Sequence, residues 1–274
     1  MSTRFNELIQ QTSFLNIPFI MAGDPTDQAT IDLAIALQEA GAHILELGIP
    51  YSDPLADGPV IQRAATRALK QKMTLRKAMG LVPKMREKGL KIPVVIFTYY
   101  NPVLQLGEEA FFALARENDV DGLLIPDLPF EESEGIRNRC FQEGIEFISL
   151  VAPTSTDRIQ KIASNARGFL YCVSSLGVTG MRSTLNENIV PFLEKVKSYS
   201  NVPVAVGFGI SDYDQVTMLK DHCDGVIVGS AIVKTIEELQ DRLVNDVQTV
   251  REQAIDDFTE VIQSIFSGAK SANF

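Results

Sequence analysis

The chain has 274 residues, of which 45% are hydrophobic and 22% charged, and its formal net charge is −10. This composition is typical of a folded globular protein and excludes disordered, collagen-like and coiled-coil chains. A chain this acidic is poorly suited to wrap nucleic acid, because that binding depends chiefly on positive charge. No apolar run approaches the roughly 20 residues that a membrane span needs, and no signal-peptide pattern opens the chain. With three cysteines that lack paired spacing, we expect a cytoplasmic protein.

Short β-branched runs alternate along the chain with longer amphipathic stretches. Most runs are apolar on both alternations, as expected for parallel strands that are covered on both faces. In chain order, the expected strands are residues 17–22, 43–49, 92–99, 122–127, 146–152, 169–174, 202–207 and 226–230. The expected helices are residues 3–12, 27–40, 60–69, 108–117, 131–142, 156–166, 186–198, 212–219 and 237–267. Gly41 is the expected C-terminal cap of its helix, and Asp157, Asn186 and Ser211 are expected helix starts.

This order of elements predicts the fold class. Alternating β and α units in this number favour a closed (β/α)8 barrel, or TIM barrel, over an open doubly wound sheet, although periodicity alone does not show closure. An extra N-terminal helix precedes the first strand. An elaborated segment, residues 50–91, follows the second strand and should contain a polar loop and two helices. No stretch resembles a linker, so we expect residues 1–274 to form a single domain.

The second strand carries one carboxylate among apolar residues. Alternation places Glu46 on the face that points into the barrel, whereas its aliphatic neighbours point toward the helices. Burial raises the pKa of a carboxyl group, and a glutamate so tuned can carry a proton at neutral pH. A structural glutamate paired with an arginine or with backbone amides is the alternative. The next loop favours the catalytic interpretation.

That loop, residues 50–59, contains three prolines and two further carboxylates. Proline restricts the shapes that a loop can adopt. Aspartate before glycine commonly serves as a turn residue or helix cap, and this is the structural alternative for Asp57. However, functional residues concentrate in loops held by a rigid barrel strand, so we expect Asp57 to lie over the same barrel mouth as Glu46.

Glycines cluster at the ends of the last three strands, in Gly177–Gly180, Gly207–Gly209 and Gly229-Ser230. Glycine lets backbone amides approach a ligand closely, and a helix N-terminus attracts anions. Barrel phosphate sites commonly form around strands seven and eight. Each motif alone is explained by turn formation, but the three together favour a phosphate-bearing substrate.

The remaining polar and aromatic residues indicate less. The aromatic residues at strand ends either line an apolar pocket or pack structurally. Asp127 either functions or caps a loop. No Cys/His cluster has metal-ligand spacing, and no nucleotide-binding motif occurs. No lysine other than Lys234 lies near a strand end, which gives a Schiff-base mechanism little support.

The segment LELGIPYSDPLADGPVIQ, residues 45–62, closely resembles the signature of the tryptophan synthase alpha subunit family. Further motifs agree with that family in order, over roughly residues 18–230: PFIMAGDP, YYNP, PDLP, APT, GVTG and GFGI. The resemblance implies a (β/α)8 barrel that carries out retro-aldol cleavage of indole-3-glycerol phosphate to indole and glyceraldehyde 3-phosphate in tryptophan biosynthesis.

The family's roles transfer to individual positions. The resemblance assigns proton transfer to Glu46 and acceptance of the indole N–H bond to Asp57. It places a set of residues around the phosphate: Thr179, Gly180, Gly209, Gly229 and Ser230. It places four aromatic residues around the indole or glycerol part: Phe19, Tyr99, Tyr171 and Phe208. Residues 177–182 resemble the family's mobile lid.

The resemblance also implies a partner, the tryptophan synthase beta subunit, in an alpha2–beta2 tetramer. Residues 51–58, 101–102 and 126–130 match regions that face it. Pyridoxal phosphate is expected in the partner, with no cofactor or metal in this chain. The alternatives are a stand-alone lyase of the same family, a non-catalytic subunit that only activates the partner, and another phosphosugar barrel.

Overall fold

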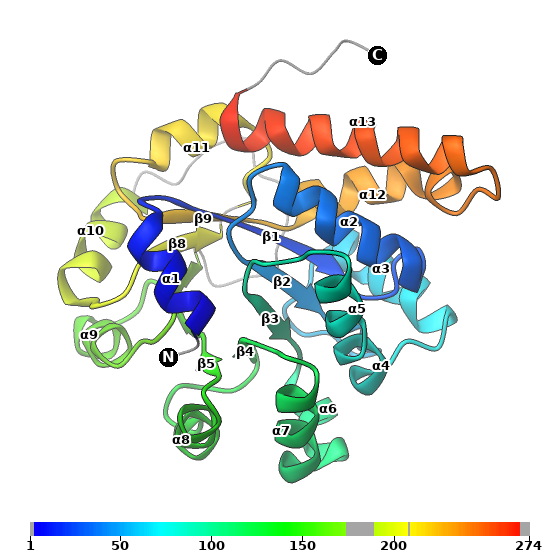
Figure 1. Ribbon diagram of the computed structural model, residues 1–274. Helices are drawn as coiled ribbons and strands as arrows, with labels where there is room; N and C mark the ends of the chain where they lie inside the picture. Colours follow the sequence, from blue (N-terminus) through cyan, green and yellow to red (C-terminus); the bar gives the residue numbers. More distant parts are fainter. Residues whose placement is uncertain (1–2, 174–188, 208, 269–274) are drawn as a thin grey trace.

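The computed structural model describes residues 3–173, 189–207 and 209–268. Its strands are all parallel and together form one central sheet (Figure 1). They are β1 (Leu15–Met21), β2 (Leu45–Gly48), β3 (Val94–Phe97), β4 (Gly122–Leu124), β5 (Glu146–Phe147), β6 (Ser149–Val151), β7 (Leu170–Val173), β8 (Val204–Gly207) and β9 (Gly225–Val228).

The order of the strands shows that the sheet closes on itself. It runs β5-β4-β3-β2-β1-β9-β8-β7-β6. The two strands at its ends are separated in the chain by Ile148 alone. One continuous segment therefore pairs with β4 on one side and with β7 on the other, which closes the barrel. The predicted (β/α)8 barrel is confirmed and the open doubly wound sheet is excluded.

Strand alternation divides the core into two parts. The side chains that point inward form one buried cluster with contributions from every strand or the residue beside it: Leu15, Ile17, Ile44, Val95, Leu124, Ile148, Phe169, Ala205 and Ile227. Phe5 of the first helix joins this cluster, so that helix covers the amino-terminal end of the barrel. The outward side chains pack against the helices in a second, larger cluster.

The helices surround the barrel, and the last of them runs across α2, α11 and α12 (Figure 1). They are α1 (Thr3–Gln11), α2 (Asp27–Glu39), α3 (Pro59–Lys70), α4 (Leu75–Met79), α5 (Leu81–Glu87), α6 (Tyr100–Leu106), α7 (Glu108–Glu117), α8 (Glu134–Glu143), α9 (Thr156–Ser164), α10 (Ile189–Tyr199), α11 (Tyr213–Leu219), α12 (Ser230–Leu243) and α13 (Gln248–Ser267). No described helix is long and apolar enough to cross a membrane.

Two expectations about helix number were wrong. The segment 50–91 contains three helices, because Gly80 separates α4 from α5. The expected helix 237–267 is divided between α12 and α13. The Asn245 side chain accepts a hydrogen bond from the Val247 backbone N–H at 2.9 Å, and this local turn competes with continuation of the helix.

Helix starts were predicted less accurately than helices. Asp212, not Ser211, caps α11, because its carboxylate accepts a bond from the Gln215 N–H. The cap of α9 is Ser155, and Asp157 lies in its first turn. Asn186 lies outside the described residues. Gly41 follows the C-cap residue of α2 and has a φ of 95°, the left-handed conformation expected of it.

Candidate active site

Glu46 lies on the inner face of β2, on the same side as Ile44 of the interior cluster. Its side chain is 1% exposed, and neither carboxylate oxygen has a hydrogen-bond partner among the described residues. Burial raises the pKa of Glu46 to about 8. The structural alternative, a glutamate paired with arginine or with backbone amides, therefore finds no support, and the carboxyl group is held in its protonated form near neutral pH.

Asp57 is held over the barrel mouth by a contact from another strand. The hydroxyl of Tyr99, at the end of β3, accepts a hydrogen bond from the Ala56 N–H at 2.9 Å and also bonds the Asp57 carboxylate. Burial raises the pKa of Asp57 to about 6, against the opposing effect of this hydroxyl. At pH 7 Asp57 is mainly ionised while Glu46 is mainly protonated, so the two acids can take different roles.

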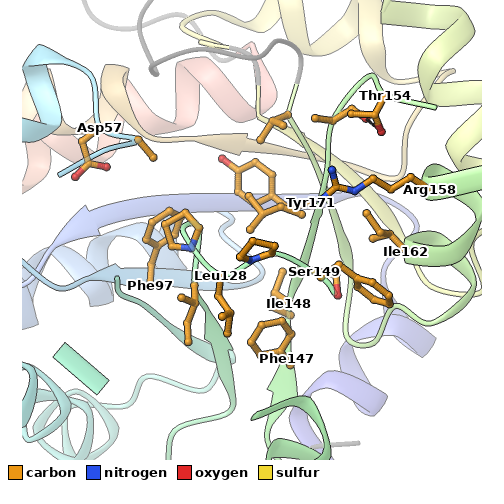
Figure 2. Close-up of a pocket in the computed structure, with 18 residues that line it drawn as sticks. Asp57, Phe97, Leu128, Phe147, Ile148, Ser149, Thr154, Arg158, Ile162 and Tyr171 are labelled. Carbon is orange, nitrogen blue, oxygen red and sulfur yellow. Dashed lines mark hydrogen bonds between the residues drawn. The ribbon is translucent and has the colours of Figure 1, made fainter. Parts of the chain in front are cut away.

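A cavity of about 340 Å³ opens beside Asp57, whereas Glu46 is not among the residues that line it. In Figure 2, Asp57 lies on one side of it, Thr154 and Arg158 lie on the other, and Tyr171 lies between them. The walls are otherwise mostly apolar: Ala56, Phe97, Ile125, Pro126, Leu128, Pro129, Phe130, Phe147, Ile148, Ser149, Leu150, Ala152, Ile162 and Val173. Most of these residues were not singled out from the sequence, because an apolar wall residue looks like any core residue until the space beside it is known.

Two glycines make room for aromatic rings at the mouth. A Cβ atom on Gly48 would lie 2.3 Å from the Phe19 ring, and one on Gly207 would lie 2.4 Å from the Tyr171 hydroxyl oxygen. Tyr171 lines the cavity, and its pKa is raised by burial and, to a smaller extent, by the charge of Glu46, so those two side chains lie close together. Phe19 packs edge-on against Phe97 with 5.4 Å between ring centroids. Phe19 and Tyr99 thus lie behind residues that line the cavity.

Three of the residues expected around a phosphate, Gly209, Gly229 and Ser230, follow the neighbouring strands β8 and β9. β8 and β9 pair with Gly207 opposite Ile227, and Gly209 and Gly229 each follow two residues after this pair. Ser230 is the first residue of α12, and its N-cap, Gly229, makes no side-chain cap bond. A helix N-terminus of this kind offers unpaired backbone N–H groups to an anion. Thr179, Gly180 and Phe208 lie outside the described residues, as does the expected lid 177–182.

Asp127 has a structural partner that its position in the sequence did not reveal. Its carboxylate accepts a hydrogen bond from the Tyr100 N–H at 2.9 Å, at the start of α6. Helix α6 itself was not predicted. Asp127 therefore holds the first backbone N–H group of α6, whose N-cap residue is Tyr99. Among the described residues, no group of three or more His, Cys, Asp or Glu side chains is arranged to hold a metal ion.

Together these features define a class: a (β/α)8 barrel with two differently tuned carboxyl groups, one buried on β2 and the other at the rim of an apolar cavity. Comparison with known proteins agrees with this class. The family model described as "Tryptophan synthase alpha chain" matches residues 5–263. The chain therefore belongs to the tryptophan synthase alpha chain family.

Individual relatives support the same assignment over nearly the whole chain. The tryptophan synthase alpha chain of Geobacillus sp. (strain WCH70) is 63% identical over 259 residues, which is 94% of this chain and 98% of the relative. That of Bacillus subtilis (strain 168) is 54% identical over 263 residues, or 96% and 97%. Among solved structures, a tryptophan synthase complex from Pyrococcus furiosus has a TM-score of 0.80 at 35% identity, covering 93% of this chain and 98% of that one. Tryptophan synthase from Mycobacterium tuberculosis has a TM-score of 0.81 at 30% identity, covering 96% and 99%.

Proposed function

We propose that the chain cleaves indole-3-glycerol phosphate to indole and glyceraldehyde 3-phosphate by a retro-aldol reaction. The observation that carries this proposal is the buried carboxyl group of Glu46, which has no hydrogen-bond partner among the described residues and lies near Tyr171 of a cavity whose rim holds Asp57. Membership of the tryptophan synthase alpha chain family supports the same reaction. The apolar walls of the cavity suit an indole ring, with one carboxylate at the rim for its polar N–H group.

The two acids divide the proton chemistry between them. Glu46, protonated near pH 7 because its pKa is about 8, gives its proton to carbon 3 of the indole ring. Positive charge then develops on the ring nitrogen, and the Asp57 carboxylate stabilises it by accepting the N–H bond. The Glu46 carboxylate next takes the proton of the side-chain hydroxyl as the carbon–carbon bond breaks. The products are indole and the aldehyde, and Glu46 has its proton again.

The rest of the substrate fits the other expected residues. In this proposal the phosphate binds at Gly209, Gly229 and Ser230, at the N-terminus of α12, together with Thr179 and Gly180. Tyr171 borders the reacting carbon in this proposal, and Phe208, which lies outside the described residues, is the other aromatic residue expected to contact the substrate. Since the site is made largely of backbone N–H groups, the net charge of −10 does not oppose binding of an anionic ester.

We also propose a tryptophan synthase beta subunit as partner, in an alpha2–beta2 tetramer that carries pyridoxal phosphate in the beta subunit. Leu55, in the loop that holds Asp57, and Leu104, in α6, are 77% and 52% exposed, which suits a surface that a partner covers. The three cysteines are buried and free, consistent with the cytoplasm as the compartment.

The test is an assay of purified chain with indole-3-glycerol phosphate, alone and with an equimolar beta subunit. Indole and glyceraldehyde 3-phosphate should form in equal amounts, and the rate should rise with the partner, because the surface of this chain that should face the partner includes the loop that holds Asp57. A rate that does not change with the partner indicates a stand-alone lyase. Absence of both products under both conditions, with the partner bound, contradicts the lyase and leaves a subunit that only activates.

A further inference from the structure

The wall of the barrel is incomplete between β4 and β6. β4 pairs with β5 through Gly122 and Leu123, and the Ile148 N–H then bonds the Leu123 carbonyl at 2.8 Å. The structure describes all of residues 122–151. Within them, no backbone hydrogen bond joins β4 to the chain after Ile148, because β6 pairs with β7 instead. A seam therefore opens in the wall just above Ile148.

The cavity passes through this seam. Ile148 and Tyr171 contact the interior of the barrel, whereas Phe147 and Ile162 belong to the layer between barrel and helices, yet all four line the same cavity. We call the part near Asp57, Phe97, Leu128 and Tyr171 the inner lobe. The outer lobe is the part near Phe130, Phe147, Ser149, Arg158 and Ile162. Figure 2 shows Asp57 on one side of Tyr171 and Ile162 on the other.

The substrate leaves the outer lobe empty. This step rests on the proposed function. Asp57 holds the ring nitrogen, Glu46 faces carbon 3, and the glycerol phosphate extends toward α12, whose N-terminal residues do not line this cavity. The edge of the indole ring opposite these groups, with carbons 5 and 6, then points across the inner lobe toward the seam. At about 340 Å³ the cavity reaches the size of drug-binding pockets, which exceeds the need of one bicyclic ring.

The chemistry of the outer lobe defines what it can take. Phe130, Phe147 and Ile162 are each less than 9% exposed and form apolar walls. Ser149 is the smallest side chain among the five and faces outward from β6. The charge of Arg158 is compensated by Glu131, whose carboxylate lies 3.2 Å from the guanidinium. A small neutral group suits this lobe better than a charged one.

We propose that the outer lobe receives a substituent on carbon 5 or 6 of the indole ring. The chain should therefore cleave indole-3-glycerol phosphates that carry a small neutral group, such as chlorine or methyl, at one of these carbons. Ser149 and Ile162 limit the size of that group, since both line the lobe, one from β6 and the other from α9.

The experiment compares kcat/KM for 5-chloro-, 6-chloro- and unsubstituted indole-3-glycerol phosphate, with the chain in complex with its beta subunit. For the wild type, kcat/KM for at least one chloro ester should be within about tenfold of kcat/KM for the unsubstituted ester. A group that did not fit would lower kcat/KM by about tenfold or more. Ser149→Leu and Ile162→Phe fill the lobe. Each should lower the ratio of kcat/KM for that chloro ester to kcat/KM for the unsubstituted ester by at least about tenfold.

A third variant tests the lobe by enlarging it. Ile162→Ala should improve the ratio for a bulkier ester, such as the bromo analogue, whereas Ile159→Ala, on the same helix but outside the cavity wall, should leave the ratio unchanged. Because each result is a ratio for one enzyme, losses through stability cancel. Rejection of both chloro esters by a wild type that cleaves the unsubstituted one overturns this inference alone. Equal losses for all substrates in the filling variants also overturn it. No cleavage of the unsubstituted ester overturns the proposed function instead.

Discussion

Replacing Glu46 by glutamine should change how the stability of the protein depends on pH. Glutamine has nearly the same shape but cannot ionise, so the two proteins differ chiefly in one titration. The pKa of Glu46 is raised by burial from 4.5 to about 8 in the folded protein. The folded state therefore holds its proton over a range where the unfolded state has lost it. The stability that this proton gives is fully present below pH 4.5 and is lost as the pH rises through 8.

The size of the effect follows from the shift. One pKa unit corresponds to about 1.4 kcal/mol, so between pH 5 and pH 8 the wild type should lose about 3 kcal/mol of unfolding free energy relative to Glu46→Gln. Urea unfolding at pH 5, 6, 7 and 8 measures this difference. Glu117→Gln, an exposed position on α7, is the control and should follow the wild type at every pH. Parallel curves for Glu46→Gln and wild type would show that the carboxyl group is solvated or paired, and would refute the reasoning.

Two further substitutions test how the site is held. Tyr99→Phe removes the hydroxyl that lowers the pKa of Asp57, so the acid limb of the kcat/KM profile, expected near pH 6, should move to higher pH; an unmoved limb would show that this bond does not tune the acid. Arg67→Met leaves Asp24, 2% exposed, without its partner at 2.7 Å, and should lower the unfolding free energy by about 3 to 5 kcal/mol in urea. Arg63→Met, which removes a 53% exposed partner of Glu237, should lower the unfolding free energy much less, because exposed ion pairs contribute little to stability, and equal losses for the two variants would contradict this distinction.

Local patterns in the sequence were sufficient to predict the barrel and the inward position of Glu46. Alternation within one strand places Glu46 inward, and the structure confirms its burial without a partner among the described residues. The family resemblance named the same residue and gave its expected role. Neither source shows where the empty space lies. Closure of the sheet occurs at Ile148. This residue lies between β5, which pairs with β4, and β6, which pairs with β7.

The features that sequence reasoning missed depend on distant contacts or on single local bonds. Tyr99 was expected to touch substrate, and the bond from its hydroxyl to the Ala56 N–H joins positions 43 residues apart that no periodicity connects. The bond from the Tyr100 N–H to the Asp127 carboxylate is of the same kind. The break at Asn245 is a local turn within an otherwise helical pattern, which a stripe of apolar residues cannot reveal.

The most direct test of the account is the rate of carbon–carbon bond cleavage by Glu46→Gln in complex with the beta subunit, at saturating indole-3-glycerol phosphate. The amide that this substitution introduces would neither give a proton to carbon 3 nor take one from the hydroxyl, so the rate should fall at least about a hundredfold, the lower range for loss of general acid–base catalysis. Binding of glycerol phosphate should be retained, because its expected site lies at the N-terminus of α12. Cleavage at the wild-type rate would contradict the assignment of Glu46 and with it the proposed mechanism.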